Sequence, residues 1–62
     1  MDNPKCKLIG EDGNAFYVVG KAIRTLKEAG MKDKADELNR NYSKCKSYDE
    51  LLCLVGDYVE IV

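Results

Sequence analysis

The sequence predicts a small α+β fold, with three short helices and a small two-stranded sheet formed by the N- and C-terminal segments. Apolar residues spaced three and four apart predict each helix. A strand-like segment at each end predicts the sheet, because strands this short have no other partner within a monomer. The 62 residues, 45% hydrophobic and 34% charged, fit one small domain spanning 1–62. A three-helix bundle, or pairing of the terminal strands across a dimer, are the alternatives.

The N-terminal part of the chain is predicted to contain a short strand and a turn before any helix. Residues 1–5 are expected to fray, since Pro4 blocks regular structure. Cys6–Ile9 is the predicted strand, and Gly10–Gly13 the predicted turn. Asn14 follows as the helix N-cap, because its short polar side chain can accept hydrogen bonds from the first free N–H groups.

The first predicted helix runs from Asn14 to a C-terminal cap at Gly30. Its apolar stripe consists of Phe16, Val19, Ile23 and Leu26, widened by Ala15, Val18, Ala22 and Ala29. Gly20 lies on the apolar side, where a glycine costs about 1 kcal/mol relative to alanine. We therefore expect another backbone to pack closely against it. Gly30 predicts a Schellman cap, with Leu26 and Met31 in hydrophobic contact.

The second predicted helix starts near Lys32 or Asp33. Its narrow apolar stripe consists of Met31, Ala35, Leu38, Tyr42 and Cys45. Asn39, Asn41 and Ser43 are poor residues for a helix interior, so fraying is expected there.

A capping box, Ser47-Tyr-Asp-Glu50, predicts the start of a third helix. Its apolar face contains Tyr48, Leu51, Leu52, Val55, Tyr58 and Val59. The tail Val59–Val62 alternates with β-branched residues, which is typical of a strand. We expect it to pair with Cys6–Ile9.

The residue types argue against catalysis. The chain has no histidine, the commonest general acid–base and metal ligand. A zinc site needs four ligands, and only three thiols are present, at Cys6, Cys45 and Cys53. We interpret these thiols as reduced and partly buried. We expect no enzymatic activity, no catalytic residue, no metal, no cofactor and no small-molecule ligand.

Two kinds of macromolecular contact remain. A chain this small gains stability by covering apolar surface, which favours a homo-oligomer or a protein partner. Tyr17 and Val18, together with the terminal strands, form the predicted interface. The alternative is weak binding of nucleic acid by a basic face on the first helix. That face consists of Lys21, Arg24 and Lys27, joined by Arg40. No aromatic stacking motif accompanies these basic residues, and the near-neutral net charge of −1 disfavours the alternative.

A longer pattern supports the same class of protein. The run Lys7-Leu-Ile-Gly-Glu-Asp-Gly-Asn-Ala-Phe16 precedes Gly20-Lys-Ala-Ile-Arg-Thr-Leu-Lys-Glu-Ala-Gly30 and, later, Tyr48-Asp-Glu-Leu-Leu52. It resembles a family of very short bacterial and phage-associated proteins with no assigned function. The chain departs from the family pattern at Asn39–Lys46. The resemblance implies a bacterial or mobile-element origin.

We therefore predict a non-enzymatic accessory or protein-interaction module that self-associates. The polar N-terminus and the absence of a long apolar run predict a cytoplasmic location without membrane contact.

Overall fold

The computed structural model describes residues 3–8 and 14–62 of the chain. Its elements follow the order β1 (Lys5–Cys6), α1 (Ala15–Glu28), α2 (Lys32–Asn41), a 3-10 turn η1 (Tyr42–Lys44), α3 (Tyr48–Tyr58) and β2 (Glu60–Ile61). The predicted α+β class is confirmed, and so is the pairing of the two terminal segments in one small sheet.

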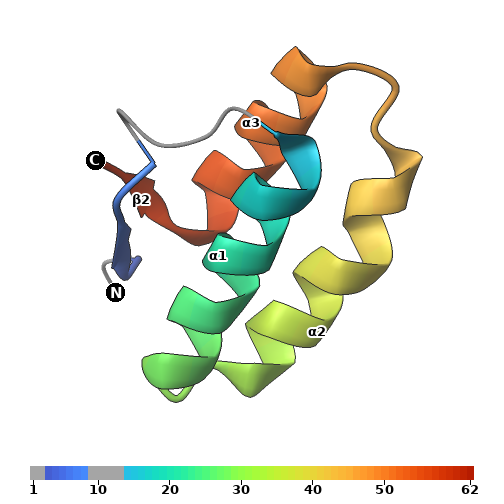
Figure 1. Ribbon diagram of the computed structural model, residues 1–62. Coiled ribbons are helices and arrows are strands. Elements are labelled where there is room, and N and C mark those ends of the chain that lie inside the picture. The colour runs from blue at the N-terminus through green and yellow to red at the C-terminus, as the bar shows by residue number, and fades with distance from the viewer. Residues whose placement is uncertain (1–2, 9–13) are drawn as a thin grey trace.

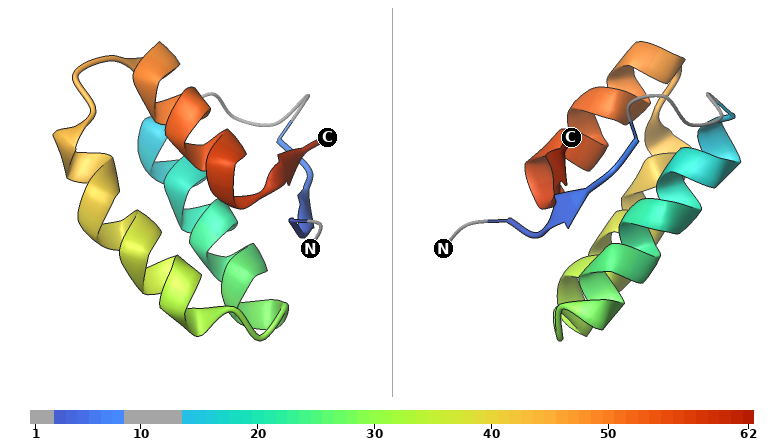
Figure 2. Two further views of the ribbon diagram at one scale, coloured as in Figure 1. Left: turned by 180° about the vertical axis from the view of Figure 1, so that it is seen from behind. Right: turned by 60° about the vertical axis from the view of Figure 1, so that its left-hand side comes forward.

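The three helices pack around a shared core, with the sheet at one side. Figure 1 shows α1 and α2 as an antiparallel hairpin, with α3 running in the same general direction as α1. The view from behind in Figure 2 shows α3 in front of α1, so α1 and α3 form opposite sides of the molecule. Both termini lie on the side of the sheet.

The sheet is parallel and shorter than predicted. Lys5 pairs with Glu60 and Cys6 with Ile61. Hydrogen bonds extend the pairing at both ends, because Glu60 N donates to Pro4 O at 2.8 Å and Leu8 N donates to Val62 O at 2.9 Å. The expected fraying of residues 1–5 is therefore wrong for residues 3–5, which lie against α3 and β2. Ile9, the last residue of the predicted strand, and the Gly10–Gly13 turn lie outside the described residues.

Both predicted caps of α1 are confirmed. The Asn14 side chain accepts hydrogen bonds from Phe16 N at 2.8 Å and Tyr17 N at 3.3 Å. At the other end Gly30 has a φ of 77°. Gly30 N donates to Lys27 O and Met31 N donates to Leu26 O, which is the hydrogen-bond pattern of a Schellman motif. The left-handed conformation at this cap explains why a glycine stands there.

The second helix ends earlier than its apolar stripe predicts. α2 stops at Asn41, within the stretch where fraying was expected, and one 3-10 turn follows. Tyr42 and Cys45 nonetheless remain half-buried against the core. The capping box of α3 is confirmed in part: Ser47 Oγ accepts from Glu50 N at 3.1 Å, whereas the Glu50 carboxylate accepts from Lys46 N rather than from Ser47 N.

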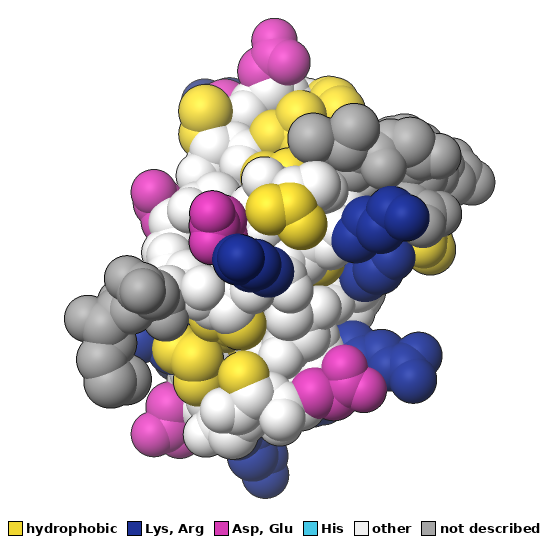
Figure 3. Space-filling view, turned by 90° about the vertical axis from the view of Figure 1, so that its left-hand side faces the viewer, with side chains coloured by type: hydrophobic (Ala, Val, Ile, Leu, Met, Phe, Trp, Pro, Cys, Tyr) yellow, Lys and Arg dark blue, Asp and Glu magenta, His cyan; other side chains and the backbone are white. Residues whose placement is uncertain are grey.

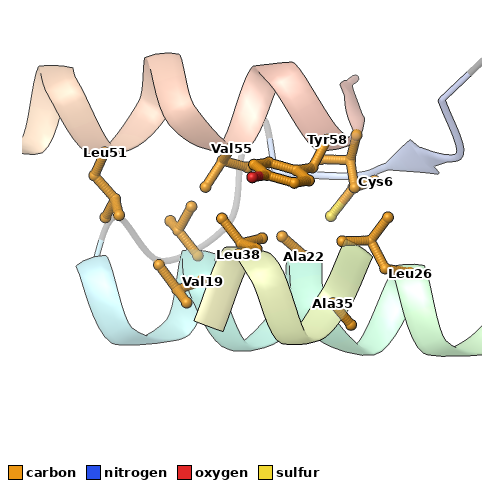
Figure 4. Close-up of a cluster of buried hydrophobic side chains, with 11 residues drawn as sticks. Cys6, Val19, Ala22, Leu26, Ala35, Leu38, Leu51, Val55 and Tyr58 are labelled. Carbon is orange, nitrogen blue, oxygen red and sulfur yellow. The ribbon is translucent and has the colours of Figure 1, made fainter. Parts of the chain in front are cut away.

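The core consists of side chains from all three helices and β1. Figure 4 shows Val19, Ala22 and Leu26 of α1 facing Leu51, Val55 and Tyr58 of α3, with Leu38 and Ala35 from α2 and Cys6 from β1. The described residues include no buried polar side-chain atom without a hydrogen-bond partner. The apolar stripes therefore close a core within one chain.

Two aromatic residues predicted for the core lie outside it. Phe16 is 77% exposed and Tyr48 is 41% exposed. The buried side of α1 is centred on Val18, Val19, Ala22 and Leu26. At about 3.6 residues per turn, Phe16 lies roughly a quarter turn away from that centre. Tyr48 is the first residue of α3, and the first turn of α3 extends beyond the helices that pack against it.

The expected close approach at Gly20 is also wrong. Gly20 is exposed, and a Cβ added to it would meet nothing within 4 Å among the described contacts. Packing against the described residues therefore does not offset its cost to helix stability.

Candidate interaction surface

The exposed side of α1 carries two aromatic residues next to cationic ones. A shallow depression there, which we call the α1 surface, is lined by Phe16, Tyr17, Gly20, Lys21, Arg24, Thr25 and Glu28. Tyr17 is 39% exposed. Exposed Phe and Tyr side chains keep apolar area in water, and covering a Phe side chain contributes about 1.5–3 kcal/mol.

Both cations of the α1 surface, Lys21 and Arg24, interact with neighbouring side chains of the same helix. The Lys21 ammonium lies 5.8 Å from the centroid of the Tyr17 ring, within the range of a cation–π contact. Arg24 Nε lies 3.5 Å from Glu28 Oε2, one helical turn away, in an exposed ion pair. Such a pair stabilises the helix only weakly. Arg24 therefore remains available for a stronger acidic partner.

A second depression, which we call the aromatic hollow, adjoins the α1 surface at Phe16. Its volume is about 370 Å³, and Phe16 and Tyr48 both line it although they come from different helices. The remaining lining residues are Ala15, Tyr42, Ser43, Cys45, Lys46, Ser47 and Leu51. Phe16 thus lies between two depressions, where a partner can reach its ring from either side.

A third depression, the α3 groove, lies along α3 and adjoins the aromatic hollow at Cys45. It is lined by Asn41, Lys44, Cys45, Asp49, Glu50, Cys53, Leu54 and Asp57. Cys53 is exposed, and Cys45 and Leu54 are half-buried. The groove therefore combines apolar side chains with three carboxylates and one lysine.

The predicted interface residues separate in the structure. Tyr17 lies on the α1 surface, but Val18 is 2% exposed and belongs to the core. The prediction that Val18 lies in an interface is therefore wrong. Its position on the helix directs its side chain into the core between α1 and the elements packed against α1. The terminal strands pair with each other inside one chain. Figure 3 shows their side of the molecule, where hydrophobic side chains lie in separate groups among charged ones.

The predicted basic face is only partly assembled. Lys21 and Arg24 line one depression, whereas Lys27 does not line it and Arg40 lies on α2. The predicted absence of aromatic residues beside these cations is wrong, because Phe16 and Tyr17 line the same depression as Lys21. Proteins that bind single strands use aromatic residues in this way.

Phe16 and Tyr48 are the surface residues that sequence reasoning missed. A signal existed for Phe16, since its quarter-turn offset from the alanine and valine positions of α1 can be counted from the sequence. No comparable signal existed for Tyr48, whose spacing fits the buried face of α3.

One polar network links α2 to α3 near the core. The Tyr58 hydroxyl donates to Glu37 Oε1 at 2.6 Å, and Asn41 Nδ2 donates to the same hydroxyl at 3.3 Å. The hydrogen bond to Glu37 raises the pKa of Tyr58 above its ordinary value of 10.0, and burial raises it further. This network links α2 to α3. Of its three residues, Asn41 lines the α3 groove.

Within residues 3–8 and 14–62, no group of three or more Cys, Asp and Glu side chains is placed to share a metal ion. Among the same residues, no helix has the length and apolar character needed to cross a membrane.

The chain matches no protein-family model, and neither the curated proteins nor the solved structures contain a significant match. The resemblance to short phage-associated proteins therefore stays a prediction.

Proposed function

We propose that this chain is a small non-enzymatic protein-binding module, and that Phe16 is the centre of its binding surface. The observation that carries the proposal is the exposure of the Phe16 ring between two depressions. Aromatic residues surrounded by a polar rim are the usual anchors of protein interfaces. Tyr17 and Tyr48 flank this anchor, and Lys21 and Arg24 supply part of the rim.

The closed core of the single chain supports this proposal. The core closes with Leu26, Leu38 and Val55 fully buried, so the fold does not need Phe16. The apolar area that Phe16, Tyr17 and Tyr48 together expose in two adjoining depressions is typical of a surface that another molecule covers. A cytoplasmic accessory role of bacterial or mobile-element origin remains part of the proposal.

Photo-cross-linking from position 16 tests this function. Replacing Phe16 by p-benzoylphenylalanine keeps an aromatic ring at the position, and the same amino acid at Lys27 is the control, since Lys27 is exposed on α1 but lines neither depression beside Phe16. In bacterial cells we expect a discrete protein adduct from position 16 that the control lacks. Equal labelling from both positions, or none from position 16, would overturn the proposal.

Binding of single-stranded nucleic acid is the second candidate function. The observation in its favour is the pairing of Phe16 and Tyr17 with Lys21 and Arg24 in one depression. Glu28 opposes it by pairing with Arg24. Titration of a labelled single strand at two salt concentrations separates the candidates, because phosphate binding weakens steeply with salt.

A further inference from the structure

We infer that the α1 surface binds the α3 groove of a second copy of this chain, so that copies assemble head to tail. The inference rests on the proposed function and names the partner of the same surface. It follows from the distribution of charge, from the fit between two helix faces, and from the exposed glycine in α1.

Charge is segregated between the two helices on opposite sides of the molecule. α1 carries Lys21, Arg24 and Lys27 against one acid, Glu28. α3 carries Asp49, Glu50 and Asp57 and no basic residue. α2 is balanced, with three basic and three acidic residues. A basic helix face and an acidic one on the same chain attract each other between copies and steer their encounter.

The two faces also match in length and in apolar character. Asp49 and Asp57 are eight residues apart, and so are Phe16 and Arg24, which is about 12 Å along a helix in both cases. In the alignment that brings Arg24 to Asp57 of the other copy, Phe16 lies at the Cys45 end of the groove. There the Phe16 ring meets Cys45 beside the Asp49 and Glu50 carboxylates, and at the other end of the groove the Arg24 guanidinium meets the carboxylate of Asp57.

Gly20 falls at the middle of this contact. It lies halfway between Phe16 and Arg24, as Cys53 lies halfway between Asp49 and Asp57. Among the residues that the structure describes, none packs within 4 Å of a Cβ at Gly20. A glycine lets two helix backbones approach closely. When the α3 helix of a second copy docks, it therefore packs closely against Gly20, which no described residue of the same chain does.

The contact joins different surfaces of the two copies. The α1 surface and the α3 groove share no lining residue, and Figures 1 and 2 place their helices on opposite sides. A contact of this kind leaves one free face at each end of a dimer, and growth continues unless a ring closes. Assembly is therefore expected to increase with concentration and to weaken as salt screens the charges.

A mixing experiment with two single-face variants tests the inference. Phe16→Asp disrupts the α1 surface, and Cys53→Arg places a bulky cation in the α3 groove; both positions are exposed, so the fold should persist. In reducing buffer we expect the wild type to assemble and each variant to bind itself at least about tenfold more weakly. An equimolar mixture should give a dimer of twice the 7.0 kDa chain mass and nothing larger.

Matched controls isolate the faces. Lys27→Glu makes the same charge change as Arg24→Glu on the same helix but outside the α1 surface, so Lys27→Glu should assemble like the wild type and Arg24→Glu should not.

Three results would overturn the inference: a monomeric wild type at every concentration, a mixture that stays monomeric, or a single-face variant that assembles normally. A monomeric wild type whose position 16 still cross-links to a different protein would leave the proposed function standing. A position-16 adduct with nucleic acid instead would overturn both proposals.

Discussion

The hydroxyl of Tyr58 donates a 2.6 Å hydrogen bond to the carboxylate of Glu37, which joins the third helix to the second. The two residues are 21 positions apart in the chain. Asn41 completes the network, because its side-chain Nδ2 donates to the hydroxyl oxygen of Tyr58. Hydrogen bonds to a charged group contribute about 1.5–3 kcal/mol, which is a large fraction of the stability of a small domain.

Tyr58→Phe removes this network without changing the shape of the ring. We expect the free energy of unfolding in urea to fall by about 1.5 kcal/mol. Tyr42→Phe is the matched control, because no described residue hydrogen-bonds the Tyr42 hydroxyl. Equal loss of stability in both variants would show that the Glu37 contact contributes nothing specific.

The same network predicts how stability depends on pH. The pKa of Tyr58 is raised in the folded chain, mainly by the hydrogen bond to Glu37, so the folded state holds this proton more tightly than the unfolded state. Its contribution is complete below about pH 10 and is lost as pH rises through the folded-state pKa. The stability difference between wild type and Tyr58→Phe should therefore shrink above about pH 10. A difference that stays constant, or grows, would contradict the assigned cause.

Gly56→Ala should stabilise the chain. Gly56 is exposed within α3, its φ is not positive, and an added Cβ meets no described residue within 4 Å. Alanine restricts the unfolded chain and favours the helix, so we expect a gain of about 0.5–1 kcal/mol in thermal or chemical unfolding. A loss instead would mean that the backbone around Gly56 differs from the one described.

Gly30→Val should destabilise the chain more than Gly30→Asn. The φ of 77° at Gly30 lies in the left-handed region, which β-branched residues resist and asparagine tolerates. The expected loss for valine is about 1–2 kcal/mol. If the two variants melt at the same temperature, the Schellman cap is not what holds the end of α1.

Ser47→Ala should cost about 1 kcal/mol, because the Ser47 hydroxyl satisfies the N–H of Glu50 at the start of α3. Ser43→Ala is the control, since the Ser43 hydroxyl makes only an exposed 3.4 Å contact with a carbonyl. Circular dichroism during urea unfolding measures both. An effect no larger than the control's would place the start of α3 elsewhere.

Local sequence signals predicted the parts of the fold that depend on local chemistry. Asn14, Gly30 and Ser47 mark helix ends because their side chains, or the lack of one, act on neighbouring backbone groups. The pairing of the chain ends was also predicted, because each short strand needed a partner. Its parallel direction and two-residue length were not predicted, since they depend on how the three helices bring the ends together.

The candidate surface was harder to predict. Periodicity identifies an apolar residue but not whether a neighbouring helix reaches it. Tyr48 fits the buried stripe of α3 by spacing, yet it is exposed in the first turn of that helix. Phe16 was assigned to the stripe of α1, yet it lies about a quarter turn from the centre of the buried side. Val18 was predicted both to widen the apolar stripe of α1 and to lie in the interface. It is buried because α2 and α3 both pack against α1.

A concentration series of amide NMR spectra tests the head-to-tail assembly most directly, since it reports each residue separately. We expect two groups of amides to shift together as concentration rises: those around Phe16 and Arg24 on α1, and those around Cys53 and Asp57 on α3. The amides of the sheet, at Cys6 and Ile61, should stay fixed. Shifts confined to the sheet, or spectra that do not change with concentration, would contradict head-to-tail assembly.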